Sequence, residues 1–199
     1  MMTLPNAITL GRIALVVVFT IAVSLTPDIP WGYPLALIAF CVAAASDWLD
    51  GYLARKLHEV TTFGKLIDPL ADKIAVAAAI IYLVHASYCP VWVAILIVMR
   101  EFLITGLRQI AQEHHVIMAA DYTGKWKTTF QLAFCIGCLL DLTVKAYPNS
   151  LGWCTPLTRL LDPQSDLPIL YHITLWGSII LTAWSGGSYC FSARKFLFR

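Results

Sequence analysis

Four aspartates interrupt a very apolar sequence, and their type and spacing suit metal chemistry. Asp47 and Asp50 follow an apolar run over residues 34–46, while Asp68 and Asp72 precede another over residues 74–84. A charged side chain inside a bilayer costs about 2.5–3.5 kcal/mol on insertion scales, so four unpaired carboxylates would cost on the order of 10 kcal/mol. These acids therefore need cations, and hard oxygen ligands suit Mg²⁺ or Mn²⁺. Two divalent ions would balance the four negative charges.

The spacing of the four acids predicts that they converge. Asp47 and Asp50 are three residues apart and Asp68 and Asp72 are four apart, so each pair lies on one face of its own helix. The connection over residues 56–64 is short, which predicts two antiparallel neighbouring helices. Small residues beside the first pair would let a bulky ligand approach the backbone closely. The pattern predicts a two-metal site that binds phosphate.

The full motif, D-x-x-D-G-x-x-A-R-x(8)-G-x(3)-D-x(3)-D, resembles the signature of the CDP-alcohol phosphotransferases, integral membrane enzymes of phospholipid synthesis. It is filled here by Asp47, Asp50, Gly51, Ala54, Arg55, Gly64, Asp68 and Asp72. The resemblance implies that the four aspartates bind two Mg²⁺ or Mn²⁺ ions and that Asp72 is the general base. It also implies that the CDP moiety contacts Asp50, Gly51, Ala54, Arg55, Gly64 and Asp68.

The first helix opens with a P-N-x-x-T-x-x-R pattern that contains Asn6, Thr9 and Arg12. One interpretation is an ordinary helix start with an interfacial arginine, because proline is well tolerated in a first helical turn. The other is that this helix forms one wall of the nucleotide site, since the pattern also resembles the family. The resemblance then implies that these three residues contact CDP.

The composition predicts the elements that must hold these residues. The chain is 59% hydrophobic and 13% charged, with a mean hydropathy of +0.72, which is typical of membrane proteins. We predict an all-α integral membrane protein, one domain over residues 1–199, with six transmembrane helices. Their expected ranges are 5–26, 34–56, 64–86, 90–114, 122–146 and 168–195. Residues 147–167, rich in Pro, Gly, Ser and Asp, are expected to form an outer loop, with room for one short helix, and with solvated Asp162 and Asp166.

Charge placement predicts the orientation of this bundle. All Lys and Arg residues except Lys145 and Arg159 fall on or toward one side of the predicted helices. By the positive-inside rule both termini are cytoplasmic, and the polar active-site cavity opens to the cytoplasm. The predicted location is the cell (inner) membrane, as a multi-pass protein. A cleavable signal peptide over residues 13–25 is the alternative for the first helix.

A second group of charges begins in the fourth helix with Arg100, Glu101 and Arg108, and continues at the start of the fifth with Lys125 and Lys127. A structural interpretation is an Arg100–Glu101 pair with snorkelling at Arg108 and interfacial anchoring of the lysines. The functional interpretation is an anion pocket, because guanidinium groups suit phosphate oxygens. In that case the four cations bind the phosphate of an acceptor substrate.

Two further motifs, M-R-E-x-x-[IV]-T/S-x-L-R over residues 99–108 and G-K-x-K-T over residues 124–128, resemble the bacterial phosphatidylglycerophosphate synthase branch of this family. This resemblance implies transfer of a phosphatidyl group from CDP-diacylglycerol to sn-glycerol 3-phosphate, with release of CMP. It also implies a homodimer among membrane lipids, and no nucleic-acid partner is expected. Two alternatives remain: another family activity such as phosphatidylinositol phosphate synthesis, or an ion- or proton-coupled transporter, since intramembrane acids can line ion paths.

Overall fold

The computed structural model is all-helical in the part of the chain that it describes. It describes the backbone of residues 4–26, 29, 31–57, 62–113 and 122–197, and the side chains of residues 8–26, 29, 31–46, 70–71, 73–111 and 124–191. The long helices are α1 (Leu4–Ser24), α2 (Gly32–Leu57), α3 (Thr62–His85), α4 (Val91–Glu113), α5 (Tyr122–Ala146) and α8 (Ile169–Leu197). The all-α prediction is confirmed, and each predicted helix range agrees with the observed one to within two residues at both ends.

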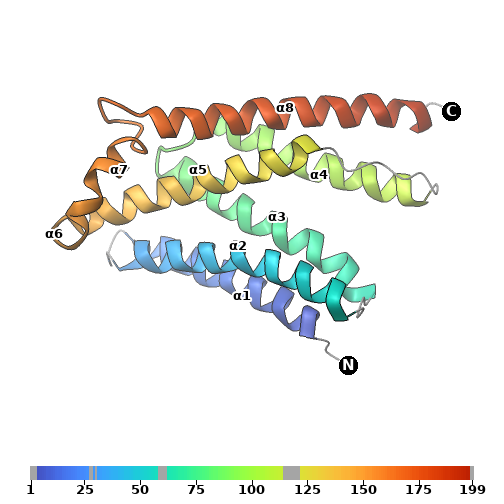
Figure 1. Cartoon of the computed structure of the whole chain (residues 1–199), viewed down its shortest axis with the longest axis horizontal. Coiled ribbons are helices and arrows are strands. Elements are labelled where there is room, and N and C mark those ends of the chain that lie inside the picture. Colours follow the sequence, from blue (N-terminus) through green and yellow to red (C-terminus); the bar gives the residue numbers. More distant parts are fainter. Residues whose placement is uncertain (1–3, 27–28, 30, 58–61, 114–121, 198–199) are drawn as a thin grey trace.

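The segment between α5 and α8 is more ordered than a simple loop. It contains α6 (Pro148–Leu151), the 3₁₀ helix η1 (Gly152–Cys154) and α7 (Thr155–Arg159). Proline occupies the first turn of both α6 and α7, where its missing N–H costs nothing. These short elements cap one end of the bundle, which we call the far end (Figure 1).

Both termini lie at the opposite end, which we call the termini end (Figure 1). Helices α1, α3 and α5 run from it toward the far end, and α2, α4 and α8 run back. Helix α1 packs against α2 and α3, whereas α8 packs against α4 and α5. Helix α5 also contacts α2 and α3, so it joins the two groups. The C-terminal half of α2 and the N-terminal half of α3 therefore lie in the same half of the molecule as the end of α8.

Small and aromatic side chains form the interior between these helices. Ala36, Ala39 and Ala43 of α2 are almost completely buried, which allows close approach of neighbouring helices. Phe19 of α1 lies between two other rings, with centroids 6.0 Å from that of Phe40 and 6.3 Å from that of Tyr82. Offset and edge-on ring pairs of this kind add stability beyond the area they bury.

The outward faces of the helices are apolar as well. Several large apolar side chains are at least 60% exposed, namely those of Ile81, Ile95, Ile180 and Trp184. Large aliphatic and aromatic side chains exposed along several helices are unusual for a protein surrounded by water. By length and composition, one helical stretch among the described residues, Gly124–Ala146, is long and apolar enough to cross a membrane. Shorter apolar stretches cover Ile8–Ser24, Gly32–Ser46 and Lys73–His85.

Candidate active site

The eight motif residues lie on two helices that contact each other. Residues 47, 50, 51, 54 and 55 are in the last turns of α2, and residues 64, 68 and 72 are in the first turns of α3. The structure thus confirms that they occupy an antiparallel helical pair. The side chains of residues 47–69 and 72 lie outside the part that the structure describes, so their coordination stays a prediction.

Helical register indicates which faces carry the four aspartates. Positions 36, 40 and 43 of α2 are buried, and positions 47, 50 and 54 continue the same alternation of four and three residues. In α3, buried positions 75, 79 and 82 are preceded in the same register by positions 68 and 72. All four aspartates are therefore at positions that extend the packed faces of adjacent helices.

Described residues elsewhere do not offer a competing metal centre. Where side chains are described, no group of three or more His, Cys, Asp or Glu residues is arranged to hold an ion. The four aspartates are outside that set. The carboxylates of α2 and α3 thus remain the candidates for metal binding.

Helix α1 contributes a buried cation next to the motif. Arg12 is 1% exposed, and its Nε lies 3.4 Å from Oγ of Ser46, the residue that precedes Asp47. Thr9, one turn earlier on α1, is 2% exposed. Both interpretations of this helix start, an interfacial arginine or a wall of the nucleotide site, stay predictions; the side chain of Asn6 lies outside the described part.

The second group of charges forms a cluster at the contact of α4, α5 and α8, which we call the basic cluster (Arg100, Glu101, Arg108 and Lys127). Glu101 Oε1 accepts from Arg100 Nη1 at 3.2 Å and is also paired with the ammonium of Lys127. The side chains of Arg100, Glu101 and Lys127 are only 10%, 16% and 4% exposed. The predicted Arg100–Glu101 pair is confirmed. One carboxylate thus holds two cations that would otherwise repel each other.

Helix α8 completes the basic cluster. Ser185 Oγ accepts a hydrogen bond from Arg100 Nη2, and the hydroxyl of Tyr189 accepts one from Arg108 Nη2. The ring of Tyr189 lies under both guanidinium groups, with centroid distances of 6.0 Å to Arg100 Cζ and 5.1 Å to Arg108 Cζ. The sequence motifs contain neither residue, and a serine and a tyrosine in an apolar helix give no signal of this role.

The two lysines at the start of α5 lie in different surroundings. Lys127 is buried in the basic cluster, whereas Lys125 is exposed beside the exposed Trp126. Residues two apart on a helix are about 200° apart around its axis, so they cannot share one face. The structure therefore brings together Arg100, Arg108 and Lys127, and separates Lys125 from them.

A second polar network occupies the far end, and we call it the far-end network (Tyr88, Asp141, Lys145 and Asp162). Asp141 Oδ2 accepts from the Tyr88 hydroxyl at 2.5 Å and lies 2.9 Å from Lys145 Nζ. The same ammonium lies 2.9 Å from Asp162 Oδ2. The prediction that Asp162 is merely solvated is wrong, because its side chain is ion-paired and 17% exposed. The i,i+4 spacing of Asp141 and Lys145 could have revealed the network from the sequence.

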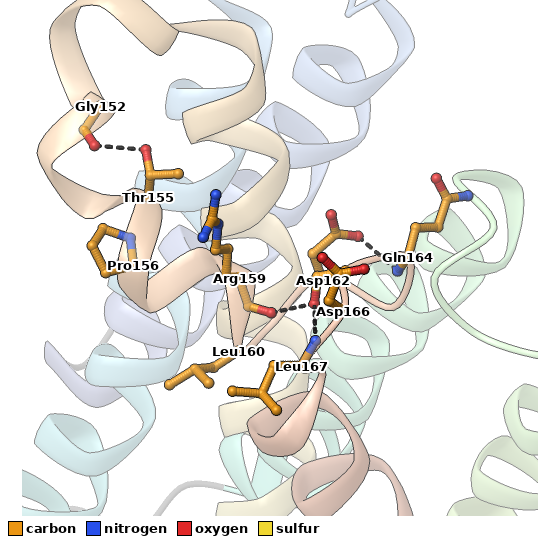
Figure 2. A pocket seen from close by; sticks show the side chains of 10 residues that line it. Gly152, Thr155, Pro156, Arg159, Leu160, Asp162, Gln164, Asp166 and Leu167 are labelled. Carbon is orange, nitrogen blue, oxygen red and sulfur yellow. Dashed lines mark hydrogen bonds between the residues drawn. The ribbon is translucent and has the colours of Figure 1, made fainter.

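A cavity of about 750 Å³ lies beside the far-end network, lined by residues of η1 and α7 and of the segment 160–167 that follows them (Figure 2). Arg159, Asp162 and Asp166 are among the residues that line it. Gln164 N donates to Asp162 Oδ1 at 2.9 Å, and Leu167 N donates to Ser165 Oγ at 3.3 Å, so the wall is held by its own local hydrogen bonds. This cavity is at the end opposite to the α2–α3 motif, and it belongs to the capping segment rather than to the candidate site.

Comparison with known proteins agrees with these features. A family profile described as CDP-alcohol phosphatidyltransferase matches residues 2–184. A Bacillus subtilis (strain 168) protein named "CDP-diacylglycerol--glycerol-3-phosphate 3-phosphatidyltransferase" is 38% identical over 95% of this chain and 94% of its own. Proteins of the same name from Rickettsia bellii (strain RML369-C) and Yersinia enterocolitica serotype O:8 are 33% and 31% identical, over 97% and 98% of this chain and 96% of each relative. The chain therefore belongs to the CDP-alcohol phosphatidyltransferase family.

Proposed function

We propose that this protein is an enzyme that transfers the phosphatidyl group from CDP-diacylglycerol to sn-glycerol 3-phosphate, which yields phosphatidylglycerophosphate and CMP. The observation that carries the proposal is the near full-length similarity to a relative named for that reaction. The family motif on the contacting helices α2 and α3 supports the donor half of the reaction. The basic cluster supports an acceptor that is itself an anion.

The donor site is formed by the α2–α3 pair and the buried face of α1. Two Mg²⁺ or Mn²⁺ ions held by Asp47, Asp50, Asp68 and Asp72 would neutralise the pyrophosphate of CDP-diacylglycerol and stabilise CMP as the leaving group. Residues proposed to contact CDP are Asn6, Thr9, Arg12, Asp50, Gly51, Ala54, Arg55, Gly64 and Asp68. Arginines provide hydrogen bonds to phosphate oxygens, and the small residues leave room for the cytidine.

The transfer itself is a displacement at phosphorus. A hydroxyl oxygen of glycerol 3-phosphate forms a bond to the lipid-side phosphorus, and the bond from that phosphorus to the oxygen of CMP breaks. Asp72 takes the proton from the attacking hydroxyl. Such reactions depend mainly on positioning and electrostatics, which a site made from two packed helices can supply.

The acceptor pocket is proposed to contain Arg100, Arg108 and Lys127 of the four cations in the sequence motifs, while the exposed Lys125 lies on another face of α5. Three of these cations gather where α4, α5 and α8 meet, and α5 contacts both donor-site helices. In the described part of the chain, Nε of Arg100 is buried and has no hydrogen-bond partner. A buried N–H without a partner is costly, and a phosphate oxygen would satisfy it.

The protein is proposed to span the cell membrane several times, with the active site facing the cytoplasm. The exposed apolar side chains of the long helices favour contact with lipid. Of the Lys and Arg residues in the sequence, Lys145 and Arg159 are the two that fall at the far end, and the others fall on or toward the termini end. The positive-inside rule therefore places the far end outside the cell. Family resemblance adds a homodimer to this proposal.

An acceptor panel tests the proposal. Purified protein with CDP-diacylglycerol and Mg²⁺ should release CMP with glycerol 3-phosphate, and far less with inositol phosphate, with serine or without acceptor. Chelation of the divalent ions should stop the release. Preference for inositol phosphate would replace the proposed activity with another of the family, and CMP release independent of any acceptor would contradict transfer.

Removing the proposed base gives the largest kinetic effect. Asp72→Asn should lower kcat by at least about 10²–10⁴-fold, because the variant cannot accept the hydroxyl proton and loses a metal ligand. CMP release is the measurement. Asp166→Asn is the matched control, since Asp166 is exposed at the far end and should leave kcat unchanged. Full turnover by Asp72→Asn would remove this residue from the mechanism.

A further inference from the structure

The last helix holds the two arginines of the basic cluster through neutral groups. Ser185 and Tyr189 are four residues apart on α8, hence on one face, and are 0% and 4% exposed. Ser185 accepts from Arg100, and Tyr189 accepts from Arg108. Both acceptors are hydroxyl oxygens, so they fix the guanidinium groups without cancelling their charge.

Tyr189 links two positions that lie far apart along α4. Arg100 and Arg108 are eight residues apart, which is about 12 Å along a helix axis. The Tyr189 ring nevertheless lies within 6.0 Å of one guanidinium and 5.1 Å of the other. The face of an aromatic ring attracts cations, so one ring can draw both arginines toward the same space despite their mutual repulsion.

Glu101 differs from these neutral partners because it cancels charge. It is paired with both Arg100 and Lys127. Gly186, next to Ser185 on α8, faces the same arginine: a Cβ there would lie in ordinary van der Waals contact with Arg100 Cγ, at 3.4 Å.

We propose that Ser185 and Tyr189 are positioning residues of the acceptor pocket, which aim Arg100 and Arg108 at the phosphate monoester of the acceptor. This inference rests on the proposed function and extends it, because the pocket then includes α8 as well as α4 and α5. Neutral hydroxyl and ring contacts keep both arginines charged and oriented before the substrate arrives. Preorganised donors of this kind strengthen binding because less order is lost on association.

The test compares the KM for the acceptor with kcat and with the KM for the donor, so that a specific loss of acceptor binding is distinguished from misfolding. Tyr189→Phe keeps the ring and removes the hydroxyl, so the KM for glycerol 3-phosphate should rise about 5–20-fold. Ser185→Ala should raise it by a similar factor. The kcat and the KM for CDP-diacylglycerol should stay within about twofold, since the proposal assigns both side chains to the acceptor pocket and not to the donor site. Tyr189→Leu removes the ring as well and should have a larger effect than Tyr189→Phe.

Two residues of the same helix are matched controls. Tyr171 is a buried tyrosine whose hydroxyl donates to the Tyr88 carbonyl at 2.9 Å, far from the basic cluster. Ser178 is a buried serine that donates to the Leu175 carbonyl at 2.7 Å. Tyr171→Phe and Ser178→Ala should leave the KM for glycerol 3-phosphate unchanged. A second readout is the rise in Tm caused by glycerol 3-phosphate, which Tyr189→Phe should reduce and Tyr171→Phe should retain.

The outcomes distinguish this inference from the proposed function. If the wild type prefers inositol phosphate, the proposed activity is wrong. The positioning role then still predicts that Tyr189→Phe raises the KM for inositol phosphate, and an unchanged KM would overturn it. If the wild type uses glycerol 3-phosphate and Tyr189→Phe raises the KM values of both substrates equally, or of neither, the positioning role is overturned. If the wild-type protein uses no phosphorylated acceptor, both the proposed activity and the positioning role are overturned.

Discussion

Among the described residues, two charged groups at opposite ends of α5 differ in how many carboxylates and cations are paired. Lys127 and Asp141 occupy one buried stripe of this helix, together with Gln131, Phe134 and Cys138, and are separated by about 21 Å along the axis. At Lys127, in the basic cluster, one carboxylate meets several cations, and a buried N–H of Arg100 lacks a partner in the described chain. At Asp141, in the far-end network, Lys145 lies between two carboxylates.

Each polar side chain of the far-end network is paired with another member of the network. Burial, and then the hydrogen bond to the Asp141 carboxylate, raise the pKa of Tyr88 well above its ordinary range. Its hydroxyl therefore remains protonated and keeps donating to Asp141 across the physiological pH range. The network ties α5 to the α3–α4 turn and to the segment that follows α7. Among the described residues, one ammonium is thus shared by two carboxylates at the far end, whereas one carboxylate is shared by two cations in the basic cluster. We expect the first arrangement to serve stability and the second to serve the proposed acceptor site.

The two lysines at the start of α5 provide the sharpest test of this comparison. Lys127→Met should raise the KM for glycerol 3-phosphate about 10–100-fold, because a charge-assisted contact in a buried cluster is lost. Lys125→Met should change it only a few-fold, because Lys125 is exposed on another face of the helix. Steady-state kinetics with both substrates measure this difference. Equal effects of the two variants would mean that burial does not decide which lysine binds the acceptor.

Loss of the far-end carboxylate should show the opposite pattern. Asp141→Asn should lower the free energy of unfolding by about 1–2 kcal/mol, since Lys145 is 45% exposed and solvent screens part of the interaction. The Tm in detergent should fall by a few degrees. Both KM values should remain those of the wild type. A selective change in the acceptor KM would contradict the separation of the two ends.

The smallest expected effect is at the rim of the same network. Asp162→Asn should cost about 0–1 kcal/mol, because the pair that it breaks is between a partly exposed carboxylate and a half-exposed lysine. High salt should reduce the difference between this variant and the wild type further. Thermal unfolding at two ionic strengths provides the measurement. A destabilisation larger than that of Asp141→Asn would show that Asp162, rather than Asp141, is the centre of the network.

Local pattern was sufficient to predict the helices and the donor motif. Apolar runs of membrane length predicted six long helices, since a buried or lipid-facing helix requires such runs whatever its neighbours are. Fixed spacing of three and four residues predicted that the aspartates share helix faces, and the short 56–64 connection predicted a hairpin. The Arg100–Glu101 pair was predictable because its members are adjacent in the chain.

Tertiary structure alone decided which distant residues meet. The contacts of Ser185 and Tyr189 with the arginines, and of Asp162 with Lys145, join positions with no common periodicity in the sequence. The burial of Lys127 and exposure of Lys125 depend on how α5 is rotated against α4 and α8, which follows from packing of the whole bundle. The sequence by itself therefore determined the helices and the kind of chemistry they hold, because both depend on local spacing. The partners of each charge depend on helix rotation and docking, which arise only when the helices pack together.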